Sequence, residues 1–345
     1  MPGPAASAAG TPPRDPPALA VAPGRPAGDG GSASPAPAAD TRPVWSRARR
    51  VRAGGVDWHV EHWPGPAPGA PVALLLHGTG ASGHSWARMV PWLTPRFELV
   101  IPDLPGHARS RVQPGHEPSL PFVADALDAL MAQLQVRPDL VVGHSAGAAV
   151  GAMLCLAGHV RPRALVSING ALLPLQGPVG RMFSPLAKLL VLNPLVPAAF
   201  AWSASWDGAA ERLLAGTGSR LDSEAVEAYR ALITDPAHAA GALRMMAAWD
   251  LRDLERRLPT LPVPLVLLVA DGDLTVPPSH GGRIAARVPG ATLRRLPGLG
   301  HLAHEEDPDA VMRLLASLGL LADERAAPPA ASGALTPPSA GVYTG

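Results

Sequence analysis

The sequence has almost no charge imbalance. Its 345 residues include 29 Lys or Arg and 28 Asp or Glu, which leaves a formal net charge of +1. Nucleic-acid-binding domains usually carry a clustered basic excess, so no nucleic-acid partner is expected. Five arginines do lie between Arg42 and Arg52. They are more typical of a solvated arm before the first strand than of a contact with an anionic membrane, and peripheral membrane contact is the alternative.

Cysteine occurs once, at Cys155, so no disulfide can form within the chain. This fits a reducing compartment, and we expect a cytoplasmic location. Uninterrupted apolar runs of ~20 residues, the length that spans a bilayer, are also absent. The nearest candidate, residues 182–202, is interrupted by prolines, a lysine and an asparagine, and is expected to form broken apolar helices. No apolar stretch at the N-terminus has the length of a signal peptide.

The two ends of the chain have few large apolar residues. Residues 1–43 and 323–345 consist mostly of Ala, Pro, Gly and Ser. Such a composition cannot bury enough surface to offset the entropy lost on ordering, so both ends are expected to be disordered tails. The folded core is expected to comprise residues 44–170 and 259–322.

Short apolar runs alternate with helical periodicity along this core. The alternation predicts an α/β fold with a doubly wound, mostly parallel sheet, whose site lies at the carboxyl ends of the strands. A helix is expected between Ser119 and Gln135, where apolar residues repeat at helical spacing. Strands are expected at residues 72–76, 97–101, 140–142, 164–168 and 265–270, and a hairpin at 51–63.

Residues 140–150 predict a strand, a sharp turn and a helix around the pentapeptide Gly143-His144-Ser145-Ala146-Gly147. A side chain at Gly143 or Gly147 would collide with the closely folded strand and helix. Ser145 is then expected to adopt a strained backbone conformation that projects its hydroxyl out of the sheet. An ordinary strand-to-helix loop is the alternative, because a motif counts only in its structural context.

A serine hydroxyl is a poor nucleophile at neutral pH and needs a base, with a further group to orient that base. Asp271 and Asp273 follow the strand at 265–270, and His301 follows a glycine-rich turn later in the chain. Asp273 is preferred, because the Asp-x-x-Val-Pro turn carries it toward the site, whereas Asp271 is expected to be solvated. We therefore expect Ser145 as nucleophile, His301 as general base and Asp273 as the orienting acid.

Two backbone amides are candidates for stabilising the negative charge that this chemistry creates. Thr79 lies in the loop His77-Gly78-Thr79-Gly80, and a simple turn is the alternative for that loop. Ala146 opens the helix after Ser145, where N–H groups are free and the helix dipole is positive. The 12 histidines include no close-spaced ligand set, so neither a metal nor another cofactor is expected.

The alternation of strands and helices stops between residues 171 and 258. This segment has the pattern of four or five uneven helices, which predicts a helical cap inserted over the carboxyl edge of the sheet. Most of its large apolar side chains are expected to form the cap's own core. Those considered as lining for a large, flat or apolar ligand are Trp202, Trp206, Met245 and Trp249.

Together, the residues around the triad resemble those of the α/β-hydrolase superfamily, over about residues 51–320. A second resemblance, to magnesium-chelatase accessory proteins of bacteriochlorophyll biosynthesis, rests on further motifs. They include Ser167-Ile168-Asn169-Gly170, Gly216-Thr217-Gly218-Ser219, Asp235-Pro236-Ala237-His238 and His301-Leu302-Ala303-His304-Glu305. The second resemblance implies a photosynthetic bacterium, a tetrapyrrole pathway, magnesium chelatase as a partner, and a location in the cytoplasm or at the photosynthetic membrane surface. Ala108 stands where the family has a glycine.

The sequence therefore predicts a serine hydrolase that cleaves an ester or related acyl bond in an apolar, tetrapyrrole-like substrate. The alternative is a non-catalytic protein that binds porphyrin or assists the chelatase on the same scaffold. An intact triad favours catalysis, because a pure binding protein has no need for a strained nucleophile.

Overall fold

The computed structural model describes residues 47–174, 201–203, 206 and 208–321. All of them belong to the second of two units into which the chain divides, residues 1–36 and 37–345. The tails expected at 1–43 and 323–345, and residues 182–200 of the expected broken helices, lie outside the described residues.

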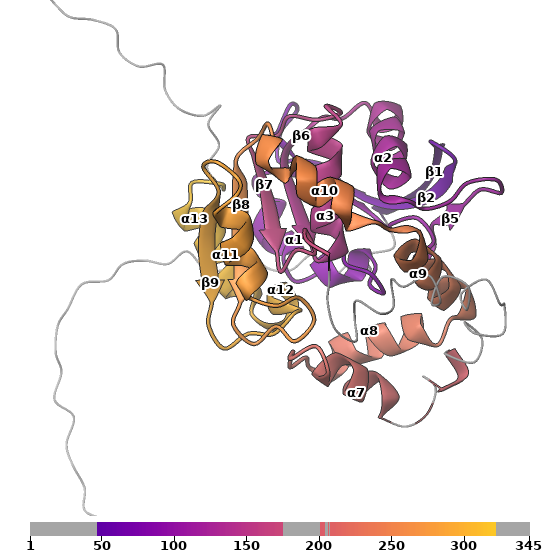
Figure 1. The fold of residues 1–345 in the computed structure, drawn as a ribbon. Coiled ribbons are helices and arrows are strands. Elements are labelled where there is room, and N and C mark those ends of the chain that lie inside the picture. The colour runs from indigo at the N-terminus through magenta and orange to yellow at the C-terminus, as the bar shows by residue number, and fades with distance from the viewer. Residues whose placement is uncertain (1–46, 175–200, 204–205, 207, 322–345) are drawn as a thin grey trace, which may run out of the picture. The chain divides into compact units, whose positions relative to one another are not determined.

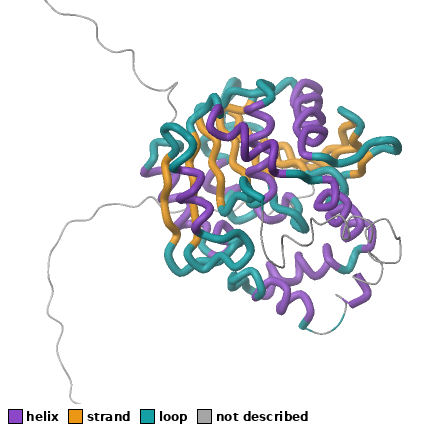
Figure 2. The backbone as a smooth tube through the Cα atoms, in the orientation of Figure 1, coloured by secondary structure: helices purple, strands orange, loops and turns teal. Residues whose placement is uncertain are grey.

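A nine-stranded sheet forms the centre of the described chain (Figures 1 and 2). Its main path runs β1-β2-β4-β3-β6-β7-β8-β9, and β5 pairs with β2. The pairings of β2 with β1, β4 and β5 are antiparallel, whereas those from β4 to β9 are parallel, so the prediction of a mostly parallel sheet is confirmed. The strands are β1 (Ala48–Ala53), β2 (Val56–Trp63), β3 (Val72–Leu76), β4 (Glu98–Pro102), β5 (Arg111–Val112), β6 (Pro138–His144), β7 (Ala164–Ile168), β8 (Leu265–Ala270) and β9 (Thr292–Leu296).

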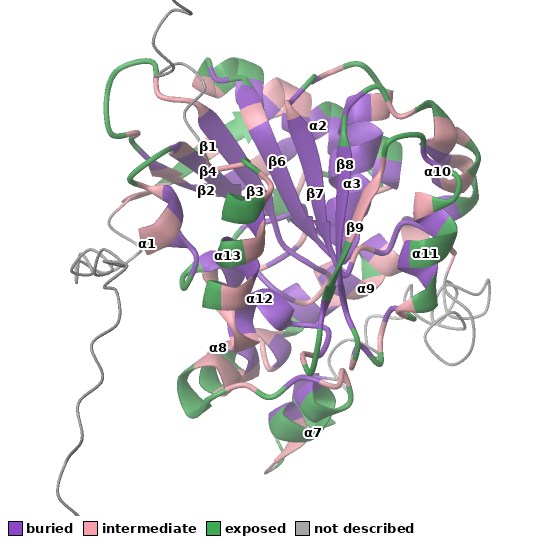
Figure 3. Cartoon of the chain, turned by 90° about the vertical axis from the view of Figure 1, so that its left-hand side faces the viewer, coloured by how far each residue is buried: buried purple, intermediate pink, exposed green. Residues whose placement is uncertain are grey.

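The central strands are buried on both faces, which explains their continuous apolar sequences (Figure 3). In β3, Val72, Leu74 and Leu76 pack into one hydrophobic cluster, and Ala73 and Leu75 into another on the opposite face. This alternation follows from the two-residue repeat of a strand. The predicted strands at 72–76, 164–168 and 265–270 are confirmed at the same bounds.

Helices cover both faces of the sheet. Buried residues of α2, α3, α10 and α11 belong to the first cluster, and those of α1 and α13 to the second. The helices of these layers are α1 (Val90–Leu93), α2 (Leu120–Leu134), α3 (Ala146–Leu156), α10 (Leu251–Arg257), α11 (Ser279–Ala285), α12 (Ala303–Glu306) and α13 (Pro308–Ser317).

Helix α2 illustrates how the sequence sets these elements. The Ser119 side chain caps its start by accepting a hydrogen bond from the Phe122 amide, and Gln135 ends it in the left-handed conformation with φ of 57°. Leu127 and Leu130 are fully buried on the face toward the sheet. The predicted helix between Ser119 and Gln135 is confirmed.

Further helices in the described residues between β7 and β8 lie beyond the carboxyl ends of the parallel strands (Figure 1). They are α7 (Ala209–Ala215), α8 (Ser223–Ile233) and α9 (Pro236–Ala248). We call residues 209–248 the helical insertion. Helix α10, which follows, packs instead on α3 beside the sheet. Within the described ranges, no helix combines the length and hydrophobicity needed to cross a membrane.

Candidate active site

Ser145 lies at the sharp turn between β6 and α3, with φ of 49° and ψ of −115°. This is a rare conformation for a residue with a side chain, as the pentapeptide predicts. A Cβ on Gly143 would lie 2.5 Å from Ala148 Cα, and one on Gly147 only 2.0 Å from Leu76 O. The two glycines therefore allow the close approach of strand and helix that produces the turn.

His301 and Asp273 meet in a buried hydrogen bond. His301 Nδ1 lies 2.8 Å from Asp273 Oδ2. The other oxygen of Asp273 accepts hydrogen bonds from the Thr275 and Val276 amides at 2.8 and 2.9 Å, which fixes the direction of the carboxylate. Asp271, the alternative acid, is exposed and pairs with Arg295 at 2.6 Å. The structure thus brings Asp273 to His301, while Asp271 faces solvent.

Two neighbouring side chains hold the backbone that carries His301. The Asn169 amide group donates to the carbonyl oxygens of Gly300 and His301 at 3.0 and 2.8 Å, and its own oxygen accepts from Ala270 N at 2.8 Å. His144 Nε2 donates to His301 O at 2.9 Å. His144 is the last residue of β6, and Asn169 directly follows β7, so both side chains tie the His301 loop to the sheet.

The helical insertion also contacts the loops of the acid and the base. Thr217 O accepts hydrogen bonds from Leu274 N at 3.1 Å and from His301 N at 3.3 Å. Ser219 Oγ accepts from Leu302 N at 2.8 Å. These contacts were not predicted from the sequence, although Thr217 and Ser219 belong to one of the motifs of the second resemblance.

The two candidate oxyanion donors line a cavity together with Ser145. Thr79 lies in the loop after β3, and Ala146 is the first residue of α3. His77 fixes the Thr79 loop through two contacts: its Nε2 accepts from Leu104 N, and its Nδ1 lies 2.8 Å from Gly78 O. Burial lowers the pKa of His77 to about 4, which keeps the ring neutral for both contacts.

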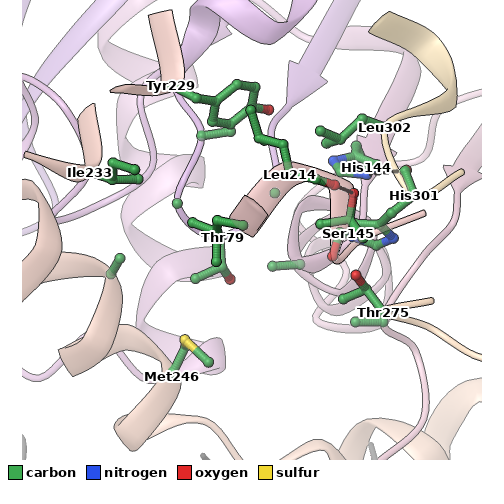
Figure 4. A pocket seen from close by; sticks show the side chains of 18 of the residues that line it. Thr79, His144, Ser145, Leu214, Tyr229, Ile233, Met246, Thr275, His301 and Leu302 are labelled. Atoms are coloured by element: carbon green, nitrogen blue, oxygen red, sulfur yellow. Dashed lines mark hydrogen bonds between the residues drawn. The ribbon is translucent and has the colours of Figure 1, made fainter. Parts of the chain in front are cut away.

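The cavity has a volume of about 510 Å³ and mostly apolar walls, within the range of small-molecule sites. Ser145, His301 and Thr275 lie at one end, opposite Tyr229 and Ile233 of the insertion (Figure 4). The insertion contributes the wall that faces the sheet edge. Its apolar contributors include Leu213, Leu214, Tyr229, Ile233, Ala239, Ala242, Leu243 and Met246.

The four side chains considered for substrate binding lie in different places. Trp249 lines the cavity, and its Nε1 donates to Pro118 O at 3.0 Å. Met245 is fully buried in the hydrophobic core, and its neighbour Met246 lines the cavity instead. Trp202 and Trp206 are 66% and 54% exposed and are not among the lining residues. They contact each other edge to face, with ring centroids 5.1 Å apart.

Several histidines surround the site without forming a metal centre in the described ranges, where no group of three or more His, Cys, Asp or Glu could hold a metal ion. His304 lies beside the site, with its ring centroid 4.5 Å from that of His144. Burial lowers the pKa of His304 to about 3, so it is a neutral packing residue.

The family follows from a comparison with known proteins. Residues 73–314 match the model of the Alpha/beta hydrolase family. The chain belongs to this family. The crystal structure of an alpha/beta hydrolase fold protein from Burkholderia ambifaria, 25% identical, superposes with a TM-score of 0.63 and covers 79% of this chain and 97% of its own. The predicted fold and the resemblance to the superfamily are confirmed.

Two curated proteins extend the comparison. The Magnesium-chelatase 30 kDa subunit of Rhodobacter capsulatus is 42% identical over 275 residues, which is 79% of this chain and 94% of the relative. This confirms the second resemblance. A protein named as a carbamate hydrolase, RutD, from Caulobacter vibrioides is 30% identical over 278 residues, 78% of this chain and 98% of its own.

Proposed function

We propose that this protein is a serine hydrolase that cleaves an ester or related acyl bond, with Ser145 as the nucleophile. The hydrogen bond between His301 Nδ1 and Asp273 carries the proposal, because it leaves His301 Nε2 with a lone pair. Ser145 and His301 line the same end of the cavity, which supports transfer of the serine proton to this lone pair (Figure 4).

In the proposed reaction, Ser145 Oγ attacks the acyl carbonyl while His301 takes its proton. Asp273 holds the imidazole in the required tautomer and stabilises the imidazolium that forms. The amides of Thr79 and Ala146 bind the oxyanion, each contributing about 3 kcal/mol. His301 then returns the proton to the leaving group. Water next attacks the acyl-enzyme while His301 takes the water's proton, and His301 returns that proton to Ser145 Oγ as the acid leaves.

The proposed substrate is a large apolar ester or related acyl compound, such as a tetrapyrrole. The cavity supports this class through its size and its apolar wall from the insertion. The relation to a chelatase subunit supports a role beside magnesium chelatase in bacteriochlorophyll biosynthesis. The proposed place of action is the cytoplasm, including the surface of the photosynthetic membrane.

Labelling with a fluorophosphonate probe tests the nucleophile and the pocket together. Purified wild-type protein is expected to label, Ser145→Ala is expected not to label, and porphyrin methyl esters are expected to slow the labelling of wild type. Turnover of an activated ester that is unchanged in Ser145→Ala would exclude Ser145 as the nucleophile. Circular dichroism of both proteins checks that the variant is folded.

A non-catalytic role is the second candidate, favoured by the name of the 42% identical relative, which describes a chelatase subunit. In that role the cavity would hold a porphyrin for delivery. Porphyrin binding that is tight and unaffected by Ser145→Ala, in a folded wild type that neither labels nor hydrolyses esters, would select this candidate.

A further inference from the structure

His238 of the insertion contacts two loops of the sheet edge at once. It lies on α9, is 1% exposed and lines the cavity. Its Nδ1 is 2.9 Å from Ala108 N, in the loop after β4, and its Nε2 is 3.2 Å from Gly80 O, in the loop after β3. One side chain of the insertion thus joins the loop that carries Thr79 to a second loop of the core.

The Ala108 contact decides which nitrogen of His238 carries the proton. A backbone N–H can only donate, so Nδ1 of His238 accepts and Nε2 bears the hydrogen. His238 Nε2 therefore donates to Gly80 O. Burial lowers the pKa of His238, which favours this neutral form.

Together with His77, His238 holds the carbonyl oxygens of the two residues that flank Thr79. Nε2 of His77 accepts from Leu104 N, so Nδ1 of His77 donates to Gly78 O. In a planar trans peptide the C=O and the next N–H point in opposite directions. Holding Gly78 O therefore sets the direction of the Thr79 N–H. Holding Gly80 O restrains the Gly80–Ala81 peptide, which follows Thr79 in the same loop, from rotating.

The backbone around His238 is shaped for this contact. A Cβ on Gly241, one turn further along α9, would lie 1.8 Å from Gly106 O, so the helix rests directly on the loop after β4. Ala108 in that loop has a positive φ of 43°, an unusual conformation for alanine. Its amide is the donor to His238, so the strained residue and the insertion helix are held by the same bond.

We propose that His238 is a positioning residue that couples the docking of α9 to the orientation of the Thr79 amide in the oxyanion hole. The inference rests on the proposed hydrolase function for its effect on turnover. The position of the Thr79 loop itself can be measured without turnover.

Two substitutions separate the contacts of His238. His238→Gln places an amide group near Nε2 and can keep the donor to Gly80 O. His238→Asn places its oxygen near Nδ1 and keeps the acceptor for Ala108, but loses the donor to Gly80. With an activated ester, we expect kcat of His238→Asn to fall about tenfold or more, with KM within about twofold, because an oxyanion donor is misdirected. His238→Gln is expected to retain kcat within about threefold.

Amide hydrogen exchange of a peptide covering residues 77–82 provides the readout that is independent of activity. We expect faster exchange in His238→Asn than in wild type and in His238→Gln, with similar thermal stability of the two variants. Equal exchange and equal kcat in all three proteins would overturn the positioning role. A fall in kcat for both variants that tracks only a loss of folded protein would overturn it as well.

The outcomes also separate this inference from the proposed function. If wild type neither labels at Ser145 nor hydrolyses an ester, the hydrolase proposal fails, and the exchange comparison alone supports or overturns the role of His238. If wild type is active and His238→Asn matches it in kcat and exchange, the hydrolase proposal stands and the inference fails.

Discussion

The candidate nucleophile and its candidate acid and base are held in different ways. Ser145 is set by the sheet and the chain next to it: its N–H donates to Ile168 O at 3.0 Å, and Gly143 and Gly147 allow the turn. The loops of Asp273 and His301 instead share hydrogen bonds with Thr217 O of the insertion.

This difference indicates that the insertion does more than form one wall of the cavity. A Cβ on Gly218 would lie 2.0 Å from Gly272 O, and Gly218 has φ of 83°, so the insertion backbone passes between the acid and base loops at very close range. The nucleophile turn is held by the core, whereas the His301 loop is held both by Asn169 and His144 of the core and by the insertion. We therefore expect the geometry of Asp273 and His301 to be more sensitive to changes in the insertion than that of Ser145.

Asp273→Asn is expected to lower kcat for an activated ester by about 10³ to 10⁴-fold. The introduced amide group can donate to His301 Nδ1, which selects the tautomer with the hydrogen on Nε2 and removes the basic lone pair there. Ser145 keeps its backbone position, so the folded structure should remain. Steady-state kinetics measure the effect, and Asp271→Asn is the matched control, because Asp271 is exposed and pairs with Arg295. A larger loss in Asp271→Asn would reassign the acid.

Ser219→Ala tests whether the insertion positions the base. The substitution removes the hydroxyl that accepts from Leu302 N, next to His301. A buried amide that loses its partner costs about 1 to 3 kcal/mol, and we expect kcat to fall about tenfold with little change in KM. Ser219→Thr keeps the hydroxyl and should recover most of the activity.

Thr234→Ala is the control for Ser219→Ala, since Thr234 caps the C-terminal end of α8, where its hydroxyl donates to Arg230 O at 2.8 Å. It removes a hydroxyl from the insertion without touching the acid or base loops. Equal activity of Ser219→Ala and wild type would show that the insertion contact has no influence on His301, and the contrast between the two parts of the site would be lost.

A second contact between insertion and core includes a titratable group. Tyr229 of α8 donates to Glu305 Oε1 of α12 at 2.7 Å, and burial raises the pKa of Glu305 to about 8. From about pH 4.5 to about pH 8 the folded protein therefore holds a proton that the unfolded chain releases. Glu305 should therefore contribute a fall in the free energy of unfolding as pH rises through this window, by up to about 1.4 kcal/mol per unit. The buried histidines, whose pKa values burial lowers, contribute with the opposite sign up to about pH 6.5, so the Glu305 contribution is read as the difference between wild type and a variant.

Glu305→Gln is expected to reduce that slope, because the amide keeps an acceptor for Tyr229 but does not titrate. Denaturant unfolding between pH 5 and pH 8 measures it. The contributions of Glu61, whose pKa burial raises to about 7, and of the buried histidines are common to both proteins and cancel in the difference. An unchanged slope would show that Glu305 is ionised in the folded protein and that its contact with Tyr229 does not depend on a bound proton.

The sequence could predict those elements whose conformation depends on residues close together in the chain. The two-residue repeat of buried strands, the helical repeat of α2 and the glycines around Ser145 each have a local steric or burial cause. Asp273 could be separated from Asp271 by the turn that follows it. The catalytic roles of these residues remain predictions.

Contacts between the insertion and the core could not be predicted, because they join residues far apart in the chain. Nothing local to Thr217 or His238 indicates that its partner is Leu274 or Gly80. Packing also decides which side of α9 faces the cavity. Gly241 lies against the core, and Met245 is buried in the core. Met246, about 100° further around the helix, therefore lines the cavity.

Met246 faces the cavity and Trp202 is exposed, so substitutions of the two should affect substrate binding differently. Met246→Ala removes apolar wall from the cavity and should raise KM for a large apolar ester severalfold, with a smaller effect on a short acetyl ester. Trp202→Ser should change KM for either ester by less than about twofold, since Trp202 is 66% exposed and does not line the cavity. The ratio of the two esters' kcat/KM values is the measurement. A larger change in that ratio for Trp202→Ser than for Met246→Ala would mean that a long substrate leaves the cavity and is held on the outer surface of the protein.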